Sequence, residues 1–159
     1  MEKSEKTNVM RLLDAAGISY NSKFSQGAEG LSGAEIARMA GEDPDKTFKT
    51  LVTVGKTGRN YVFVIPVEAE LDLKKAAKAS GEKSIEMIKQ KELLPLTGYV
   101  HGGCSPIGMK KLFPTWFDET AILFDTIYFS AGKIGAQVEI CPDDINKIIP
   151  ASFADITKE

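Results

Sequence analysis

The amino-acid sequence predicts a single α+β domain over residues 1–159, in which a mixed, mostly antiparallel and barrel-like sheet is flanked by short helices. First, strand-like segments cluster between about residues 48 and 140, with short helical segments among them. Second, the chain shows neither a regular alternation of strand and helix nor a G-x-G-x-x-G sequence after a strand, which argues against a doubly wound dinucleotide-binding fold. Third, a length of 159 residues is typical of one domain.

Each element is predicted from the spacing of its apolar residues and from the residues that start and stop it. Helices are expected at residues 5–16, 32–41, 72–80, 89–94 and 142–149. Turns or loops are expected at residues 25–30, 43–45, 55–60, 98–111 and 130–135. Strands are expected at residues 18–24, 48–54, 61–67, 84–88, 115–117, 127–130, 137–140 and 152–156, the last as an edge strand.

The helix ends carry the clearest local signals in the first third of the chain. Gly17 can end the first helix. Ser32 and Glu35 have the S-x-x-E spacing of a capping box, in which each side chain bonds a backbone amide at the start of the helix, and Gly41 can end that helix. The sequence Asp43-Pro44-Asp45 is typical of a turn.

The middle and the end of the chain combine strands with short helices. Residues 61–67 are apolar with little polar alternation, which predicts a central strand buried on both faces. Asp72 can cap the next helix and Gly81 can end it. Pro95 is expected to stop the helical turns before it, whereas Pro142 suits the first turn of the last helix.

Residues 98–111, with the sequence GYVHGGCSPIGMKK, have a composition that neither a helix nor a strand favours. Glycine is used where φ must be positive or where another group approaches the backbone closely. The pair Gly102-Gly103, followed by Ser105-Pro106, predicts a fixed turn that presents amides and a hydroxyl to a bound molecule. A tight connection between strands, without a binding role, is the alternative interpretation.

Lys49 lies inside an apolar strand, where lysine is uncommon unless it has a partner or a function. Alternation places Lys49 on the same side of the strand as Leu51 and Thr53. A cation there could hold a phosphate, a carboxylate or a developing oxyanion. The alternative is a lysine at the strand edge whose ammonium group reaches water.

Other reactive residues give weaker signals. Cys104 and His101 are close in sequence, but a Cys-His pair needs contact and an orienting third group, so Cys104 is expected to be a packing residue. One histidine and no C-x-x-C sequence do not make a zinc site, and the sequence predicts no metal and no cofactor. Lysines between residues 74 and 91 form a basic segment that is either a solvated face or a contact for nucleic-acid phosphates.

The overall composition is that of an ordinary soluble globular protein. A net charge of −2 predicts no strong non-specific affinity for nucleic acids or membranes, so an anionic partner would need a local basic patch. Two cysteines and no secretory segment at the start of the sequence predict a reducing, cytoplasmic environment. No apolar run has the length of a membrane span.

Four segments, in this order and spacing, resemble the YbaK/EbsC family. They are Phe48-Lys49-Thr50-Leu51, Leu71–Ala77 (LDLKKAA), the 98–111 loop and Ser130-Ala131-Gly132-Lys133. The resemblance covers residues from about 8 to 156, and the sequence CSPIGM at 104–109 is most similar to the EbsC-like branch.

The resemblance implies both a fold and an activity. The family consists of free-standing relatives of the editing domain of bacterial prolyl-tRNA synthetases, and its members hydrolyse mischarged aminoacyl-tRNA, with Cys-tRNA(Pro) as the best-known substrate. A mixed sheet with flanking helices and a pocket between them is therefore expected. Mischarged tRNA is the expected partner, prolyl-tRNA synthetase is a candidate second partner, and no membrane partner is expected.

The resemblance also assigns site residues. The implied catalytic residues are Lys49 and Gly102, and the implied substrate-binding residues are Gly103, Ser105, Pro106, Ser130 and Gly132. In the mechanism that the resemblance implies, the thiol of the substrate attacks its own ester carbonyl. Lys49 would hold the 3′ end of the tRNA, and the Gly102 loop would position the carbonyl.

One departure from the family keeps a second hypothesis open. The family often carries His or Tyr in the loop after the first strand, whereas this sequence reads Ser22-Lys23-Phe24-Ser25-Gln26. A non-catalytic module of the same fold that binds tRNA or prolyl-tRNA synthetase is therefore the alternative function.

Overall fold

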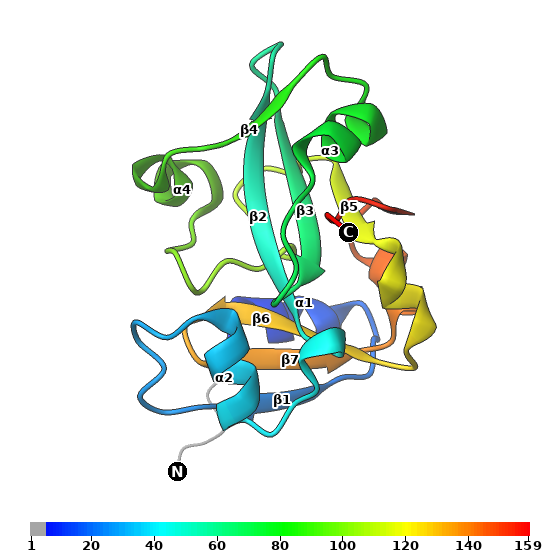
Figure 1. Cartoon of the computed structure of the whole chain (residues 1–159). Helices are drawn as coiled ribbons and strands as arrows, with labels where there is room; N and C mark the ends of the chain where they lie inside the picture. The colour runs from blue at the N-terminus through cyan, green and yellow to red at the C-terminus, as the bar shows by residue number, and fades with distance from the viewer. Residues whose placement is uncertain (1–5) are drawn as a thin grey trace.

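The strands of the computed structural model, which describes residues 6–159, form two sheets (Figure 1). One sheet has the order β1-β7-β6 and the other the order β4-β2-β3-β5-β8. The strands are β1 (Asn21–Phe24), β2 (Phe48–Gly55), β3 (Asn60–Pro66), β4 (Ile85–Met87), β5 (Thr115–Asp118), β6 (Ile127–Lys133), β7 (Ala136–Ile140) and β8 (Ala151–Ala154). The helices are α1 (Asn8–Ala15), α2 (Gly33–Met39), α3 (Leu73–Ser80) and α4 (Gln90–Thr97), with 3-10 turns η1 (Pro44–Lys46), η2 (Glu119–Leu123) and η3 (Pro142–Lys147).

The predicted α+β class is confirmed, and one of the two sheets is mixed. The three-stranded sheet is antiparallel throughout. In the five-stranded sheet, β2 pairs antiparallel with β3 and β4, whereas β5 pairs parallel with β3 and β8. Strand β3 lies at the centre with Tyr61–Ile65 buried, as its apolar run predicts. The strands divide into two sheets, and an isolated parallel bridge between Thr47 and Tyr128 links them.

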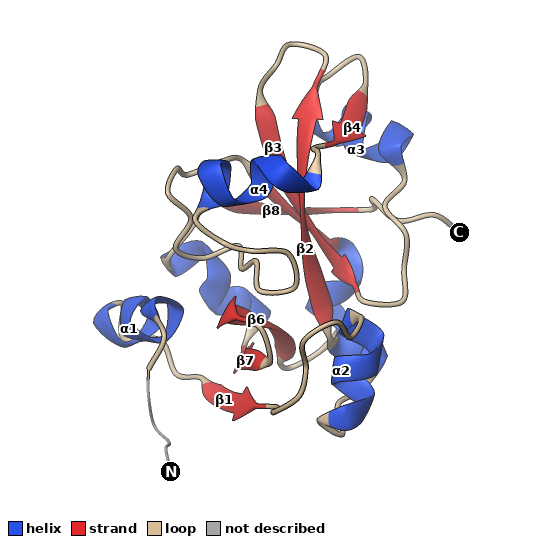
Figure 2. Ribbon diagram, turned by 90° about the vertical axis from the view of Figure 1, so that its left-hand side faces the viewer, coloured by secondary structure: helices blue, strands red, loops and turns tan. Residues whose placement is uncertain are grey.

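The helices cover the five-stranded sheet on both faces. Figure 2 shows α4 in front of β2 and α3 behind the sheet. Phe48, Val52 and Val64 belong to a large core that includes residues of both sheets, of α1 and of the 98–111 loop. Leu51, Phe63 and Ile65 point to the opposite face and pack with Ala76 and Ala77 of α3. The sheet therefore separates α3 from α4 and the loop that follows it.

The predicted start and stop signals of α2 and α3 are present. Ser32 and Glu35 form the complete capping box. The carboxylate of Asp72 accepts hydrogen bonds from the amides of Lys74 and Lys75, and Gly81 ends α3 at a φ of 77°. Local side-chain chemistry therefore sets the bounds of these two helices. Residue 5, where the first helix was expected to begin, lies outside the described residues; α1 begins after its cap at Thr7.

Three local predictions differ from the structure. Pro95 lies inside α4 instead of stopping it. Proline has no N–H group, so the backbone carbonyl of Lys91 loses its helical hydrogen bond. Both residues are exposed, and water can bind this carbonyl instead. The expected glycine loop at 130–135 is mostly strand β6, with a bulge between Ser130 and Lys133. The last helix is a short 3-10 segment, η3.

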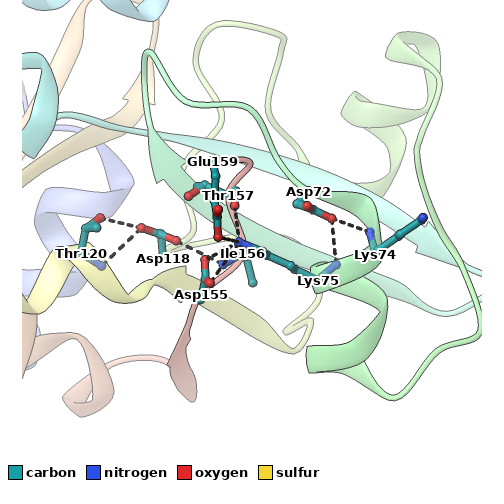
Figure 3. Close-up of polar contacts among 9 residues, drawn as sticks. All are labelled: Asp72, Lys74, Lys75, Asp118, Thr120, Asp155, Ile156, Thr157 and Glu159. Atoms are coloured by element: carbon teal, nitrogen blue, oxygen red, sulfur yellow. Dashed lines mark hydrogen bonds and ion pairs between the residues drawn. The ribbon is translucent and has the colours of Figure 1, made fainter.

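The C-terminal segment, residues 155–159, contacts α3 and the start of η2 through hydrogen bonds and ion pairs, which Figure 3 shows. Asp118 is buried and accepts hydrogen bonds from the backbone amide of Ile156 at 3.2 Å and from Thr120. Lys75 binds both carboxylate oxygens of Asp155 at 3.0 and 3.1 Å and the carbonyl of Thr157 at 2.8 Å. These contacts hold Ile156 in the core beneath α3.

Candidate functional site

Lys49 is one of four half-buried lysines in the part of the chain that the structure describes. Lys23 donates to the carbonyl of Ala40, Lys46 lies near Glu139 and Thr126, and Lys75 binds Asp155. Within residues 6–159, only Lys49 of these four makes no hydrogen bond or ion pair. Burial lowers the pKa of Lys49, and the charge of Glu70 opposes this shift, but Glu70 forms its ion pair with Lys158. Lys49 is thus a partly desolvated cation that is free to bind an anion.

The bridge between the sheets brings Lys49 beside the second predicted segment. Thr47 pairs with Tyr128 in the parallel direction, and β2 and β6 contact each other. Since side chains alternate along a strand, Lys49 and Ser130, each two residues further on, are directed to the same side of this junction. The fold therefore places two residues that are 81 positions apart in sequence at the same junction between the sheets.

Ser130 lies at the bulge of β6 and is held by its own turn. Its hydroxyl accepts a hydrogen bond from the backbone amide of Gly132 at 3.0 Å, which leaves the hydroxyl proton available. Gly132 has a φ of 94°, and a Cβ there would lie 3.0 Å from the ring of Tyr99 and 3.2 Å from Val9. Only glycine fits this position, because both the conformation and the space exclude a side chain.

The Gly102-Gly103 pair packs against the turn that follows the bulge. A Cβ on Gly103 would lie 3.1 Å from the backbone nitrogen of Ile134 and 3.3 Å from the carbonyl carbon of Lys133. Gly102 is exposed and has a φ of 89°. The loop backbone can therefore lie directly on the β6–β7 turn, with Gly102 at the surface next to it.

Ser105 and Pro106 lie on the inner side of the loop, and Pro106 also lines a second surface pocket with Leu12 and Ile149. Both are buried, and the Ser105 hydroxyl accepts a hydrogen bond from the amide of Ile107 at 3.3 Å. The Tyr99 hydroxyl donates to the carbonyl of Ile107 and closes the same turn. These two hydrogen bonds fix the shape of the loop around Ser105 and Ile107.

A polar row beside Ser130 was not predicted from the sequence. In register, Ser130 of β6 pairs with Gln137 of β7, which pairs with Lys23 of β1. The Gln137 Oε1 and Glu42 Oε2 atoms are buried without a hydrogen-bond partner among the described residues, and burial raises the pKa of Glu42. The alternation of Gln137 and Glu139 with apolar residues in β7 is the signal that could have revealed this face.

A surface pocket of about 290 Å³ opens beside this polar row, between β1 and α2. It is lined by Lys23, Phe24, Ser25, Gln26, Met39 and Ala40. The side chains of Phe24 and Met39 are about half exposed there. The pocket combines apolar walls with a lysine, although Lys49, Gly102 and Ser130 are not among its lining residues.

Cys104 is buried, and burial raises the pKa of its thiol to about 12. Since the thiolate is the reactive form of cysteine, this environment opposes nucleophilic catalysis at neutral pH. His101 is exposed in the same loop whereas Cys104 is buried, so the two side chains do not lie in one shared environment. The geometry favours Cys104 as a packing residue.

A Cys104→Ser variant is therefore expected to change the rate of the reaction proposed below by less than about threefold, because no thiolate is lost. Steady-state rates of the wild-type and variant enzymes at equal concentration test this expectation. Complete loss of activity in a variant with an unchanged thermal midpoint would assign the chemistry to the thiol.

Two further properties of the described residues bear on the site. Residues 6–159 contain no group of three or more histidine, cysteine, aspartate and glutamate side chains that could hold a metal ion. None of the helices within that range is long and apolar enough to cross a membrane.

Comparison with known proteins gives a consistent result. Residues 29–148 match the model of a family described as the aminoacyl-tRNA editing domain. A protein of Enterococcus faecalis, EbsC, described as a candidate Cys-tRNA(Pro)/Cys-tRNA(Cys) deacylase, is 46% identical over 154 residues, which are 96% of this chain and 94% of that protein.

Solved structures share the fold at low sequence identity. A protein described only as hypothetical has a TM-score of 0.86 at 23% identity, covering 96% of this chain and 100% of that one. A candidate trans-editing enzyme for prolyl-tRNA synthetase has a TM-score of 0.81 at 23% identity, covering 98% and 100% of the two chains. At this identity the two structures support the fold alone.

Proposed function

Because this chain belongs to the aminoacyl-tRNA editing domain family, we propose that it is a trans-editing deacylase that cleaves the ester of mischarged tRNA, with Cys-tRNA(Pro) as its expected substrate. The 46% identity to EbsC over nearly the whole chain supports both the reaction and the aminoacyl group. A cytoplasmic location follows from this role, since mischarged tRNA is formed there.

The observation that carries the proposal is the free cation at Lys49. An ester attached to tRNA brings phosphate groups next to the reacting carbonyl, and a partly desolvated ammonium group attracts them more strongly than an exposed one does. Ser130 is directed to the same side, and Gly132 holds its hydroxyl as an acceptor. Gly102 lies at the surface of the adjacent loop.

We propose a substrate-assisted reaction for this site. The cysteine thiol of the substrate attacks its own ester carbonyl, so that a C–S bond forms and the C–O bond to the ribose breaks. The amino acid leaves as its cyclic thioester, which water then opens to free cysteine. The thiol proton passes to the leaving ribose oxygen. Lys49 holds the 3′ end of the tRNA, and Gly102 positions the carbonyl. This division of roles fits a site with a buried Cys104, because positioning alone can accelerate a reaction whose nucleophile is already attached.

Deacylation assays on a panel of charged tRNAs test the proposed function. Purified protein should release cysteine from Cys-tRNA(Pro) faster than proline from Pro-tRNA(Pro). Equal rates with cysteine and proline esters would contradict the selectivity for cysteine. Binding without release of any amino acid would favour the alternative, a non-catalytic module that binds tRNA or prolyl-tRNA synthetase. The changed loop at Ser22–Gln26 is the reason for this alternative.

A synthetase partner would explain how the enzyme selects its tRNA. A net charge of −2 gives the chain no long-range attraction to the negatively charged tRNA. Prolyl-tRNA synthetase, which produces the mischarged species, is therefore the proposed partner. Adding the synthetase to the deacylation assay should lower the concentration of tRNA needed for half-maximal rate.

A further inference from the structure

Positive charge is concentrated beside the candidate site, although the whole chain is slightly acidic. Residues 93–117 contain no aspartate or glutamate, and their charged residues are Lys110 and Lys111. Residues 126–138, which include β6, the turn after it and the start of β7, have Lys133 as their charged residue. The 98–111 loop and the β6–β7 turn are therefore locally basic in a chain with a net charge of −2.

These three residues, which we call the loop lysines, are exposed and unpaired. In the described range 6–159, the side chains of Lys110, Lys111 and Lys133 make no hydrogen bond or ion pair. Elsewhere the exposed Lys147 and Lys158 bind Asp144 and Glu70. An exposed lysine with no nearby acid keeps its full attraction for an external anion.

The loop lysines lie on the backbone that carries Gly102. The backbone of Lys133 and Ile134 packs on Gly103. The aliphatic part of the Lys110 side chain packs beside Gly98, where its Cγ would lie 3.4 Å from an added Cβ. Lys133 therefore lies beside the Gly102-Gly103 pair, whereas Lys110 and Lys111 stand at the end of the same loop, where Lys111 lines a surface pocket with Leu12 and Ile149. Phosphates of a nucleic-acid backbone are the anions that rows of free lysines bind, through charge and release of counterions.

We propose that the loop lysines form the docking surface for the sugar-phosphate backbone of the tRNA, beside the 3′ end that enters the site. This inference rests on the proposed function for the identity of the nucleic acid. The α3 surface, with the exposed Lys74 and Lys78, lies on the opposite face of the five-stranded sheet.

The test is a double variant, Lys111→Glu with Lys133→Glu, which leaves Lys110 in place because its stem packs beside Gly98. Affinity for uncharged tRNA should fall by roughly tenfold or more, and the slope of log affinity against log salt should fall by about 1 to 2. The double variant Lys74→Glu with Lys78→Glu makes the same change in net charge and should bind tRNA like the wild type.

A kinetic measurement separates docking from chemistry. With Cys-tRNA(Pro), KM should rise while kcat stays within about twofold, and the rate on a short cysteinyl-nucleoside ester should be unchanged. Wild-type affinity and salt slope in the Lys111/Lys133 variant, or an equal loss in the α3 control, would overturn the proposed surface. Because uncharged tRNA is the binding probe, the surface is tested even if no ester is cleaved, a result that would refute the deacylase function only.

Discussion

A Lys49→Met variant is expected to lose about 10²-fold or more of the deacylation rate while remaining folded, because the partly desolvated cation that holds the 3′ end of the tRNA in place for the reaction is removed. Methionine is similar to lysine in length and lacks the charge, so the variant removes the ammonium group and little else. Single-turnover rates with Cys-tRNA(Pro) measure the effect on chemistry apart from product release.

The stability of this variant should be unchanged or higher. Burial lowers the pKa of Lys49 in the folded protein, so the unfolded chain holds this proton over a pH range in which the folded chain has lost it. The charged lysine therefore opposes folding at neutral pH, and this cost disappears as the pH rises through the lowered pKa toward the ordinary value of 10.5. Replacing the amine removes the cost at neutral pH, which a thermal melt can measure.

The pH dependence provides an independent check. If the ammonium form of Lys49 is required, the enzymatic rate should fall on the alkaline side at a pH below the ordinary lysine pKa, because burial has lowered it. A Lys49→Arg variant keeps a positive charge that does not titrate there, so its residual activity should lack this fall. Near-wild-type turnover in Lys49→Met would remove Lys49 from the mechanism, and Lys78→Met on the exposed side of α3 serves as the control.

A Gly135→Ala variant is expected to destabilise the protein by about 3 kcal/mol or more, since it combines a strained conformation with a backbone clash. Gly135 has a φ of 83°, and a Cβ there would lie 2.4 Å from the carbonyl oxygen of Ser25. The backbone at Ser25 or the β6–β7 turn must move to relieve this contact. Because Gly102 and Gly103 pack on that turn, activity should fall as well.

Gly58→Ala is the matched control for this effect. Gly58 also has a positive φ, 89°, but nothing lies within 4 Å of a Cβ there. Its cost should be that of the left-handed conformation alone, about 1 to 2 kcal/mol. Chemical denaturation of both variants measures the difference. Equal free energies of unfolding would show that the contact between Gly135 and Ser25 does not constrain the turn.

The elements that could be predicted from the sequence are those with local signals. The Ser32 and Glu35 capping box, the Asp72 cap and the central burial of β3 follow from a few neighbouring residues. The effect of Pro95 could not be predicted in this way, because it depends on which side of α4 faces water. The assignment of the chain to the editing-domain family is confirmed.

The site is harder to predict because its properties depend on distant partners. Lys46 and Lys75 find their partners Thr126 and Asp155 80 residues along the chain, and no local pattern shows that Lys49 lacks one. The pairing of Thr47 with Tyr128, from which the common side of Lys49 and Ser130 is inferred, is a single isolated bridge. The roles of Lys49, Gly102 and Ser130 stay predictions until the variants are measured.

The division into two sheets has a consequence for how the enzyme tolerates mutation. Lys49 is carried by one sheet and Ser130 by the other, and the two sheets share one core. A volume change at Val52 or Phe129 that tilts one sheet against the other would misalign cation and hydroxyl before the chain unfolds. In a saturation scan, turnover should therefore be lost at interior positions that never touch substrate.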